Sequence, residues 1–153
     1  PRIGLVWAGN PRRLNDQVRS LSIERIAPLV QRHDATWVSL QSGGAASKVP
    51  SLAGRVHDWS AGFTDFAATA ALIDTLDLVI AADTSVAHLA GALGKPVWVL
   101  LARVPDWRWL LDREDSPWYP SARLFRQRTA GDWTMPVADA ADALRALVAQ
   151  RQR

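Results

Sequence analysis

Apolar and polar positions alternate along this chain in blocks that predict an α/β fold. Residues 78–82 and 97–101 are nearly continuous apolar runs, as in parallel strands covered by helices on both faces. Weaker runs predict four further strands, at residues 3–7, 37–40, 55–59 and 122–126. Because segments of helical periodicity separate most of these runs, we expect a doubly wound, mainly parallel, Rossmann-like sheet with residues 78–82 at its centre.

The predicted helices begin at recognisable capping residues. Ser22 can cap a helix that starts at Ile23, and Thr64 or Asp65 can cap a helix that runs to about residue 76. A last helix opens at Met135-Pro136. Its acidic residues come early and its arginines late, which suits the helix dipole.

The segment between the two most apolar strands is a candidate ligand site. Asp83-Thr84-Ser85 supplies helix-capping residues, and Gly94 followed by Pro96 ends the helix. We expect its apolar stripe to face the sheet and His88 to lie on the opposite side; the stripe consists of Val86, Leu89, Ala90 and Leu93. A helix N-terminus at the carboxyl edge of a parallel sheet favours phosphate, which His88 would then touch. A purely structural interpretation, with His88 on the surface and Asp83 or Thr84 acting only as a cap, stays open.

Two more loops are expected at the same edge of the sheet. Residues 41–44 follow the strand at 37–40, and residues 9–20 follow the first strand. The second of these loops starts at a glycine and can donate hydrogen bonds to a phosphate or a sugar; its polar residues are Asn10, Arg13, Asn15 and Arg19. The alternative is a surface loop whose arginines pair with Asp16 and Glu24. Neither Gly-x-Gly-x-x-Gly nor the P-loop pattern occurs, which argues against a dinucleotide-binding fingerprint and a P-loop NTPase.

Composition excludes several function classes. The 18 basic residues are all arginine except Lys48 and Lys95, and they are dispersed, so we expect no nucleic-acid partner. With no cysteine there is no disulfide, thiolate nucleophile or sulfur-based metal site. His33 and His57 are expected to be structural, and the three histidines do not show metal-ligand spacing. No apolar run is long enough to span a bilayer and no signal peptide is present, so we expect a cytoplasmic location.

Residues 102–121 form an unusually long connection rich in tryptophan. It holds Trp107, Trp109 and Trp118. Long loops without structure are uncommon in compact domains, and indoles bury large apolar areas. We expect the segment to pack on the body of the domain through these indoles, with a helical turn near residues 107–111.

Several motifs together resemble one family of enzymes. They are Trp7-Ala-Gly-Asn-Pro11, Asn15-Asp16, Val38-Ser-Leu-Gln41, Asp65-Phe66, Asp83-Thr-Ser-Val-Ala-His88, Gly94-Lys-Pro96, Pro105-Asp-Trp-Arg-Trp109, Ser116-Pro-Trp-Tyr-Pro120 and Leu124-Phe-Arg-Gln127. The chain resembles the C-terminal half of bacterial glycosyltransferases that often follow tetratricopeptide repeats. It is similar to ADP-heptose:LPS heptosyltransferases and, more remotely, to O-linked N-acetylglucosamine transferases. The resemblance covers essentially the whole chain.

The resemblance implies the donor-binding half of a two-domain (GT-B) enzyme. Residues 1–153 would be a single nucleotide-sugar-binding domain, while an N-terminal acceptor domain and any tetratricopeptide repeats would lie outside this chain. The implied binding residues are Gly9, Asn10, Arg13, Asn15, Gln41, Asp65, Asp83, Thr84, Ser85 and His88. No metal or other cofactor is implied. One departure from the family pattern is Arg13-Leu14, where members tend to have His-Lys.

The resemblance also implies a reaction and its partners. The full-length protein would transfer a sugar, with inversion, from a UDP- or ADP-linked donor to an acceptor protein or glycolipid. Because the catalytic base would lie in the other half, this chain would be inactive alone. Contact with a membrane surface is expected, if at all, only for the full-length protein. The alternative, favoured by Leu14, is a non-catalytic nucleotide-sensing or protein-interaction module that keeps the fold.

Overall fold

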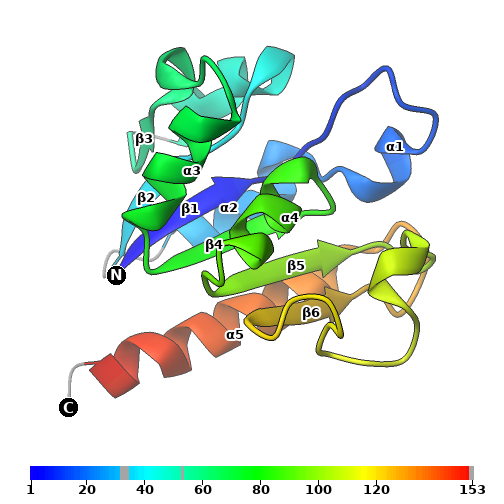
Figure 1. Cartoon of the computed structure of the whole chain (residues 1–153). Coiled ribbons are helices and arrows are strands. Elements are labelled where there is room, and N and C mark those ends of the chain that lie inside the picture. The colour runs from blue at the N-terminus through cyan, green and yellow to red at the C-terminus, as the bar shows by residue number, and fades with distance from the viewer. Residues whose placement is uncertain (32–34, 53, 152–153) are drawn as a thin grey trace.

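A twisted sheet of six parallel strands forms the middle layer of the molecule (Figure 1). The computed structural model describes residues 1–31, 35–52 and 54–151. The strand order is β3-β2-β1-β4-β5-β6, and every neighbouring pair is parallel. The strands are β1 Arg2–Val6, β2 Thr36–Ser39, β3 Val56–Asp58, β4 Leu78–Ala82, β5 Val97–Leu101 and β6 Ala122–Arg126. The predicted parallel α/β sheet is therefore confirmed, with β4 as one of its two central strands.

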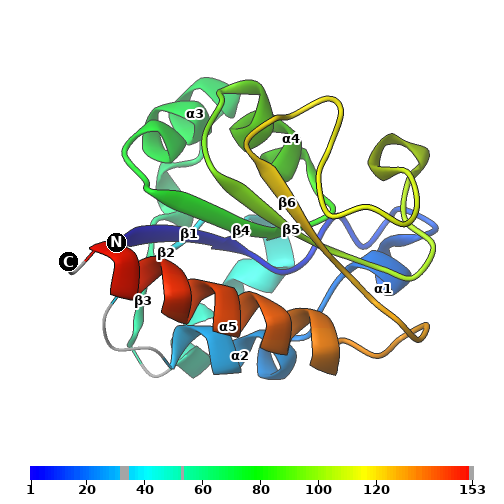
Figure 2. The ribbon, with the colours of Figure 1, turned by 90° about the horizontal axis from the view of Figure 1, so that it is seen from below.

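Helices cover both faces of the sheet (Figure 2). One face carries α2 (Ile23–Val30) and α5 (Thr134–Arg151), and the other carries α3 (Phe66–Asp74) and α4 (Ser85–Ala92). The four-residue helix α1 (Asp16–Arg19) lies beyond the carboxyl end of β1. The described residues also form three 3₁₀ segments: η1 (Gly43–Leu52), η2 (Ser60–Gly62) and η3 (Trp107–Trp109). This is the doubly wound arrangement that right-handed crossovers produce.

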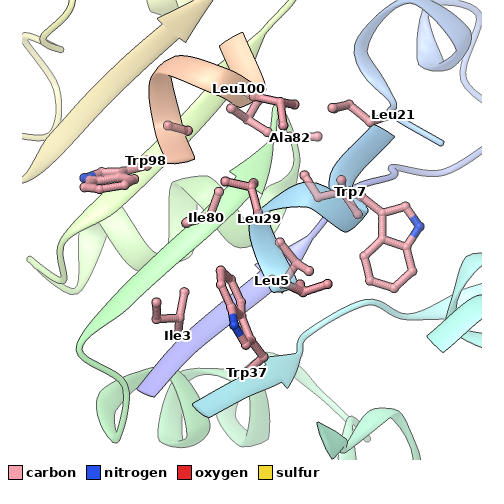
Figure 3. Close-up of a cluster of buried hydrophobic side chains, with 14 of the residues drawn as sticks. Ile3, Leu5, Trp7, Leu21, Leu29, Trp37, Ile80, Ala82, Trp98 and Leu100 are labelled. Carbon is pink, nitrogen blue, oxygen red and sulfur yellow. The ribbon is translucent and has the colours of Figure 1, made fainter. Parts of the chain in front are cut away.

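The sheet divides the core into two apolar clusters. All residues of β4 and β5 are buried, as the continuous apolar runs predict. On the side of α2 and α5, the sheet contributes Ile3, Leu5, Trp37, Ile80 and Leu100 (Figure 3). On the other side, Val79, Ala81, Val97 and Val99 lie beneath α3 and α4. Alternate residues of each strand thus enter opposite clusters.

The capping signals largely behave as predicted. The Asp65 carboxylate accepts a hydrogen bond from the Ala68 N–H at 2.8 Å and starts α3. Gly94 has φ +69° directly after α4, the left-handed conformation that ends a helix at low cost only for glycine. Ser22 is the N-cap of α2, although its side chain makes no capping hydrogen bond. The sequence pattern does not predict α1, η1 or η2: α1 and η2 have only four and three residues, and η1 is a 3₁₀ segment.

The predicted inner face of α4 is partly wrong. Ala87, Ala90 and Gly91 are the buried residues, whereas Leu93 is 44% exposed. Val86 and Leu89 are half-buried against the same cluster. Small residues occupy the inner face because the helix packs closely on the sheet and on Tyr119, whose ring lies against Gly91. His88 consequently borders the buried face instead of lying opposite to it.

Two other histidine predictions have different outcomes. His57 is exposed on β3, so the expected packing role is wrong. β3 is an edge strand of three residues in which only Val56 is buried, so His57 and Asp58 are both open to solvent. His33 lies outside the described residues.

Candidate functional site

The candidate site lies at the carboxyl edge of the sheet, where several connections meet (Figure 1). β1 pairs with β4 and β4 pairs with β5, all in parallel. The loop after β1, the turn after β4 and the segment after β5 therefore leave neighbouring strands at the same edge. This is the edge at which open α/β sheets bind ligands.

Thr84 and the first turn of α4 offer unpaired donors at this edge. Thr84 is the N-cap, and its carbonyl accepts hydrogen bonds from the N–H groups of Ala87 and His88 at 3.1 and 3.4 Å. Its Oγ1 is buried and has no hydrogen-bond partner among the described residues. The N–H groups of Ser85 and Val86 also find no acceptor in the described part of the chain. A buried hydroxyl beside free helix N–H groups suits an anionic oxygen.

Asp83 is a buried carboxylate at the end of β4, with 7% of its surface exposed. Burial raises its pKa, but His88, the Trp109 indole and Arg19 together lower it further, so the pKa lies below its usual value. Arg19 Nη1 donates to the Asp83 carbonyl at 3.0 Å, and Arg19 Nε bonds to Asp16 at 3.2 Å. Asp83 is therefore ionised at neutral pH and tied to α1 through Arg19.

His88 is held by aromatic residues of the segment 102–121. Its ring stacks on Trp109, with centroids 4.9 Å apart and planes inclined by 22°. Its Nδ1 lies 2.9 Å from the Tyr119 hydroxyl, and its Nε2 lies 3.7 Å from Asp83 Oδ1. The side chain is 28% exposed. The expectation that His88 stands clear of apolar packing is wrong, because the long connection folds back over α4 and covers it.

Trp109 and Tyr119 anchor the tryptophan-rich segment on the domain. Trp109 is fully buried. The Tyr119 ring packs directly on Gly91, so closely that an added Cβ there would lie 2.5 Å from the ring. In contrast, Trp107 and Trp118 are 67% and 57% exposed and meet edge to face. The predicted packing through indoles therefore holds for Trp109 alone among the three. The predicted helical turn is present as η3.

Arg126 of β6 fixes the backbone of the same segment. Its guanidinium donates to the carbonyl oxygens of Arg113 at 2.7 Å and Leu110 at 3.0 Å, and also to that of Trp109. Leu110 and Asp112 have φ of +53° and +55°, a region that residues other than glycine seldom adopt. The three hydrogen bonds maintain this strained path and set the position of Trp109.

The predicted polar residues of the β1 loop lie at the same edge; Arg19 is half-buried, and the other three are exposed. Asn10 Oδ1 accepts a hydrogen bond from the Arg12 N–H at 3.0 Å, while Arg13 and Asn15 extend into solvent. Gly9 has a steric role, since a Cβ there would lie 2.4 Å from Asp16 Oδ1 and 2.6 Å from Arg19 Nη2. The loop thus presents an arginine and two amides to solvent at the edge of the sheet where α4 begins.

Gln41 is engaged with the chain itself. It is buried, and its Oε1 accepts hydrogen bonds from the N–H groups of Trp7 and Ala8 at 3.1 and 3.0 Å. Its Nε2 donates to the carbonyls of Ala8 and Ser42 at 2.9 and 3.1 Å. These bonds hold the start of the β1 loop against β2. Asp65, the cap of α3, is exposed beyond the β3 end of the sheet.

The sequence does not predict that three residues border or support the site: Trp109, Tyr119 and Arg126. The available signal was a cluster of aromatic residues in a connection too long to be unstructured. Its docking position on α4 depends on Gly91, a helical glycine without a local explanation in the sequence. Among the described residues, no group of three or more His, Asp and Glu side chains could hold a metal ion.

Comparison with known proteins identifies the family. The profile of glycosyltransferase family 9 (heptosyltransferase) matches residues 49–130, more than half of the chain. The chain belongs to glycosyltransferase family 9. The matched region contains β4, α4 and the segment 102–121, and therefore Asp83, Thr84, Ser85, His88 and also Asp65. The β1 loop and Gln41 precede the matched region.

The chain is also similar to individual proteins. Protein FlbA of Caulobacter vibrioides is 31% identical over 95% of the chain, which spans only 25% of that protein. E. coli ADP-heptose LPS heptosyltransferase II has the same fold, with TM-score 0.63, 16% identity, and all of this chain matched to 48% of it. The E. coli heptosyltransferase WaaC, solved with ADP, gives TM-score 0.62 and 12% identity over 96% of this chain and 44% of its own. This family 9 chain is thus about half as long as the solved enzymes.

No helix in the described ranges has the length and apolar character needed to cross a membrane. The predicted association with tetratricopeptide repeats and the remoter similarity to O-linked N-acetylglucosamine transferases stay predictions.

Proposed function

We propose that this chain is the donor-binding half of an inverting glycosyltransferase whose donor is a UDP- or ADP-linked sugar. The diphosphate would lie at the N-terminus of α4, next to Thr84, Ser85 and His88. The observation that carries this proposal is the buried Thr84 Oγ1 beside the N–H groups of Ser85 and Val86 in the first turn, none of which has a hydrogen-bond partner within the described residues. Membership of family 9 supports it, as does the fold shared with heptosyltransferase WaaC, a protein solved with ADP.

Charge balance at this edge fits a diphosphate without a metal ion. The α4 N-terminus brings the positive end of the helix dipole, and Arg13 on the neighbouring loop brings a full positive charge. Asp83, the nearest carboxylate, already faces His88, with Arg19 on its carbonyl. The amides, the hydroxyls and Arg13 would then stabilise the leaving diphosphate as negative charge develops on it.

The proposed reaction is a direct displacement at the anomeric carbon. An acceptor hydroxyl forms the new glycosidic bond while the bond from the anomeric carbon to the diphosphate oxygen breaks, and that oxygen keeps the electron pair. The acceptor proton goes to a base. We place the base and the acceptor, a protein or a glycolipid, in the part of the longer protein outside this chain, so the chain alone would bind donor without transferring sugar.

Leu14 favours a second candidate, a nucleotide-sensing or protein-interaction module without transfer activity. The side chain is fully exposed in the β1 loop at a position where family members tend to have lysine. Without that cation the loop offers less positive charge to a diphosphate.

Isothermal titration calorimetry of the chain with ADP and UDP tests the proposal. We expect one of the two nucleotides to bind, equally well with Mg²⁺ and with EDTA. Ser85→Ala together with Thr84→Val should weaken binding roughly tenfold or more, because charge-assisted hydrogen bonds contribute about 1.5–3 kcal/mol each. Arg123→Ala, on β6 away from the site, serves as the matched control. Strict dependence on a divalent cation would contradict metal-free binding, and lack of binding to both nucleotides favours the second candidate.

A further inference from the structure

Two aromatic residues far along the chain from α4 determine how the His88 ring is oriented. Tyr119 contacts the ring at its Nδ1 side, where the hydroxyl lies 2.9 Å away. Trp109 covers one face of the ring at 4.9 Å. Asp83 lies beyond Nε2 at 3.7 Å, an ion-pair distance longer than a hydrogen bond. The only hydrogen bond of normal length to the imidazole among the described residues is therefore the one to Tyr119.

The chemistry of these neighbours selects one form of the neutral ring. An ionised carboxylate can only accept, so the imidazole nitrogen that faces Asp83 favours carrying the proton. Nδ1 of that tautomer is an acceptor, and the Tyr119 hydroxyl donates to it. Both ring nitrogens then have neighbours within the protein. In this arrangement His88 would affect ligand binding indirectly, by holding the Asp83 carboxylate in place and by shaping the site.

The Tyr119 hydroxyl is placed by rigid surroundings. The phenol ring rests on Gly91, where no side chain intervenes, and the Tyr119 N–H donates to Ser116 Oγ at 3.4 Å. Arg126 fixes the other end of the segment through carbonyl oxygens at residues 109–113. A side chain held in this way can orient its partner, because neither its backbone nor its ring is free to follow the histidine.

We infer that Tyr119 is a positioning residue for the proposed donor site: it fixes His88 with Nε2–H toward Asp83, and so fixes the Asp83 carboxylate beside the α4 N-terminus. Trp109 supports the same orientation by stacking. The inference rests on the proposed function for its ligand. The ring orientation itself is measurable in the free chain.

The experiment follows His88 by long-range ¹H–¹⁵N NMR in the wild-type chain and in Tyr119→Phe. The chain has three histidines and one tyrosine, so the His88 signals can be assigned by comparison with His88→Gln. In the wild type, at a pH where the ring is neutral, we expect a protonated Nε2 and a hydrogen-bonded, unprotonated Nδ1. Tyr119→Phe should remove the Nδ1 hydrogen-bond shift and mix the two tautomers. Binding of the nucleotide that the wild type binds, ADP or UDP, should weaken roughly three- to tenfold, the effect of one lost hydrogen bond.

Trp118→Phe is the matched control, an exposed aromatic of the same segment whose Nε1 bonds to the Arg108 carbonyl. It should leave both the His88 signals and the binding of the nucleotide, ADP or UDP, that the wild type binds unchanged. Unchanged His88 nitrogens in Tyr119→Phe would overturn the inference, as would an altered ring with unaltered affinity for that nucleotide. If the wild type binds neither ADP nor UDP, the proposed function fails, while the NMR comparison still decides whether Tyr119 orients His88.

Discussion

Two connections at the carboxyl edge of the sheet differ in polarity, in exposure and in how they are anchored. The loop after β1 is polar and largely exposed, and its backbone is held at its base by Gln41 and by Ser20, whose Oγ accepts from the Gly9 N–H at 2.9 Å. The segment 102–121 is aromatic and anchored by a fully buried Trp109 and by Arg126. The first offers charged groups to solvent, and the second contacts His88 directly.

The comparison shows that donor groups and the residues that orient them come from different parts of the sequence. Arg13 and Asn15 are easily noticed as ligand-binding types, yet each is exposed and has few constraints. Trp109 and Tyr119 look like core residues, yet they border the candidate site. Four predictions test this division between the two connections.

Trp109→Ala should have the largest effect. Removing a fully buried indole costs about 3–5 kcal/mol of unfolding free energy and would release His88 as well. Urea denaturation followed by far-UV circular dichroism measures this. Trp107→Ala, 67% exposed in the same 3₁₀ turn, should change stability by no more than about 0.5 kcal/mol. Equal effects of the two changes would mean that Trp109 does not anchor the segment.

Gly91→Ala should have the second-largest effect on stability. The added methyl group would lie 2.5 Å from the Tyr119 ring, so the ring must move, at a cost of about 1–3 kcal/mol. Gly44→Ala is the matched control, because a Cβ there meets nothing within 4 Å and φ is not positive. Thermal unfolding of both variants checks the prediction. A Gly91→Ala chain as stable as the control would show that the segment does not rest on α4.

Asp83 should make the free energy of unfolding depend on pH. Its pKa is lowered in the folded chain, so its ionisation stabilises the fold above the unfolded pKa of about 3.9, and this contribution is lost as pH falls through the lower folded value. The difference in unfolding free energy between the wild type and Asp83→Asn should therefore be full at neutral pH and shrink below about pH 4. Urea midpoints from pH 3 to 7 measure it. A difference independent of pH would indicate that Asp83 acts only by packing.

Arg13→Ala should have the smallest effect. It should weaken nucleotide binding and leave the free energy of unfolding unchanged. An exposed arginine contributes about 0.2–1 kcal/mol to an ionic contact, so affinity for the nucleotide that binds, ADP or UDP, should fall by no more than about fivefold. The loss should shrink at high salt, since exposed charges are screened. Calorimetry at two salt concentrations tests this, with Arg123→Ala as the control. An effect of Arg13→Ala on unfolding would mean that the β1 loop is anchored more firmly than its exposure indicates.

Much of the fold could be predicted because β4 and β5 are continuous apolar runs and helix caps such as Asp65 are local signals. The position of Asp83 and Thr84 followed from the same local pattern. The orientation of α4 could not be predicted, because Leu93 looks like a core residue until the close approach of the sheet and Tyr119 selects Ala87, Ala90 and Gly91 instead. The environment of His88 likewise depends on a contact across 31 residues of chain.

The strand order also sets a sequence of events for folding. Among the six strands of this sheet β1 comes first in sequence, yet it lies between β2 and β4, and its register with β4 joins Ile3 to Leu78. One edge of β1 therefore stays unpaired until the residues of β4, more than 70 positions further along the chain, can reach it. Pairings between strands so distant in sequence form slowly, and until they form they leave unpaired strand edges that are prone to aggregation. The kinetics of refolding should accordingly be limited by the β1–β4 pairing, after which the second half can add strand by strand.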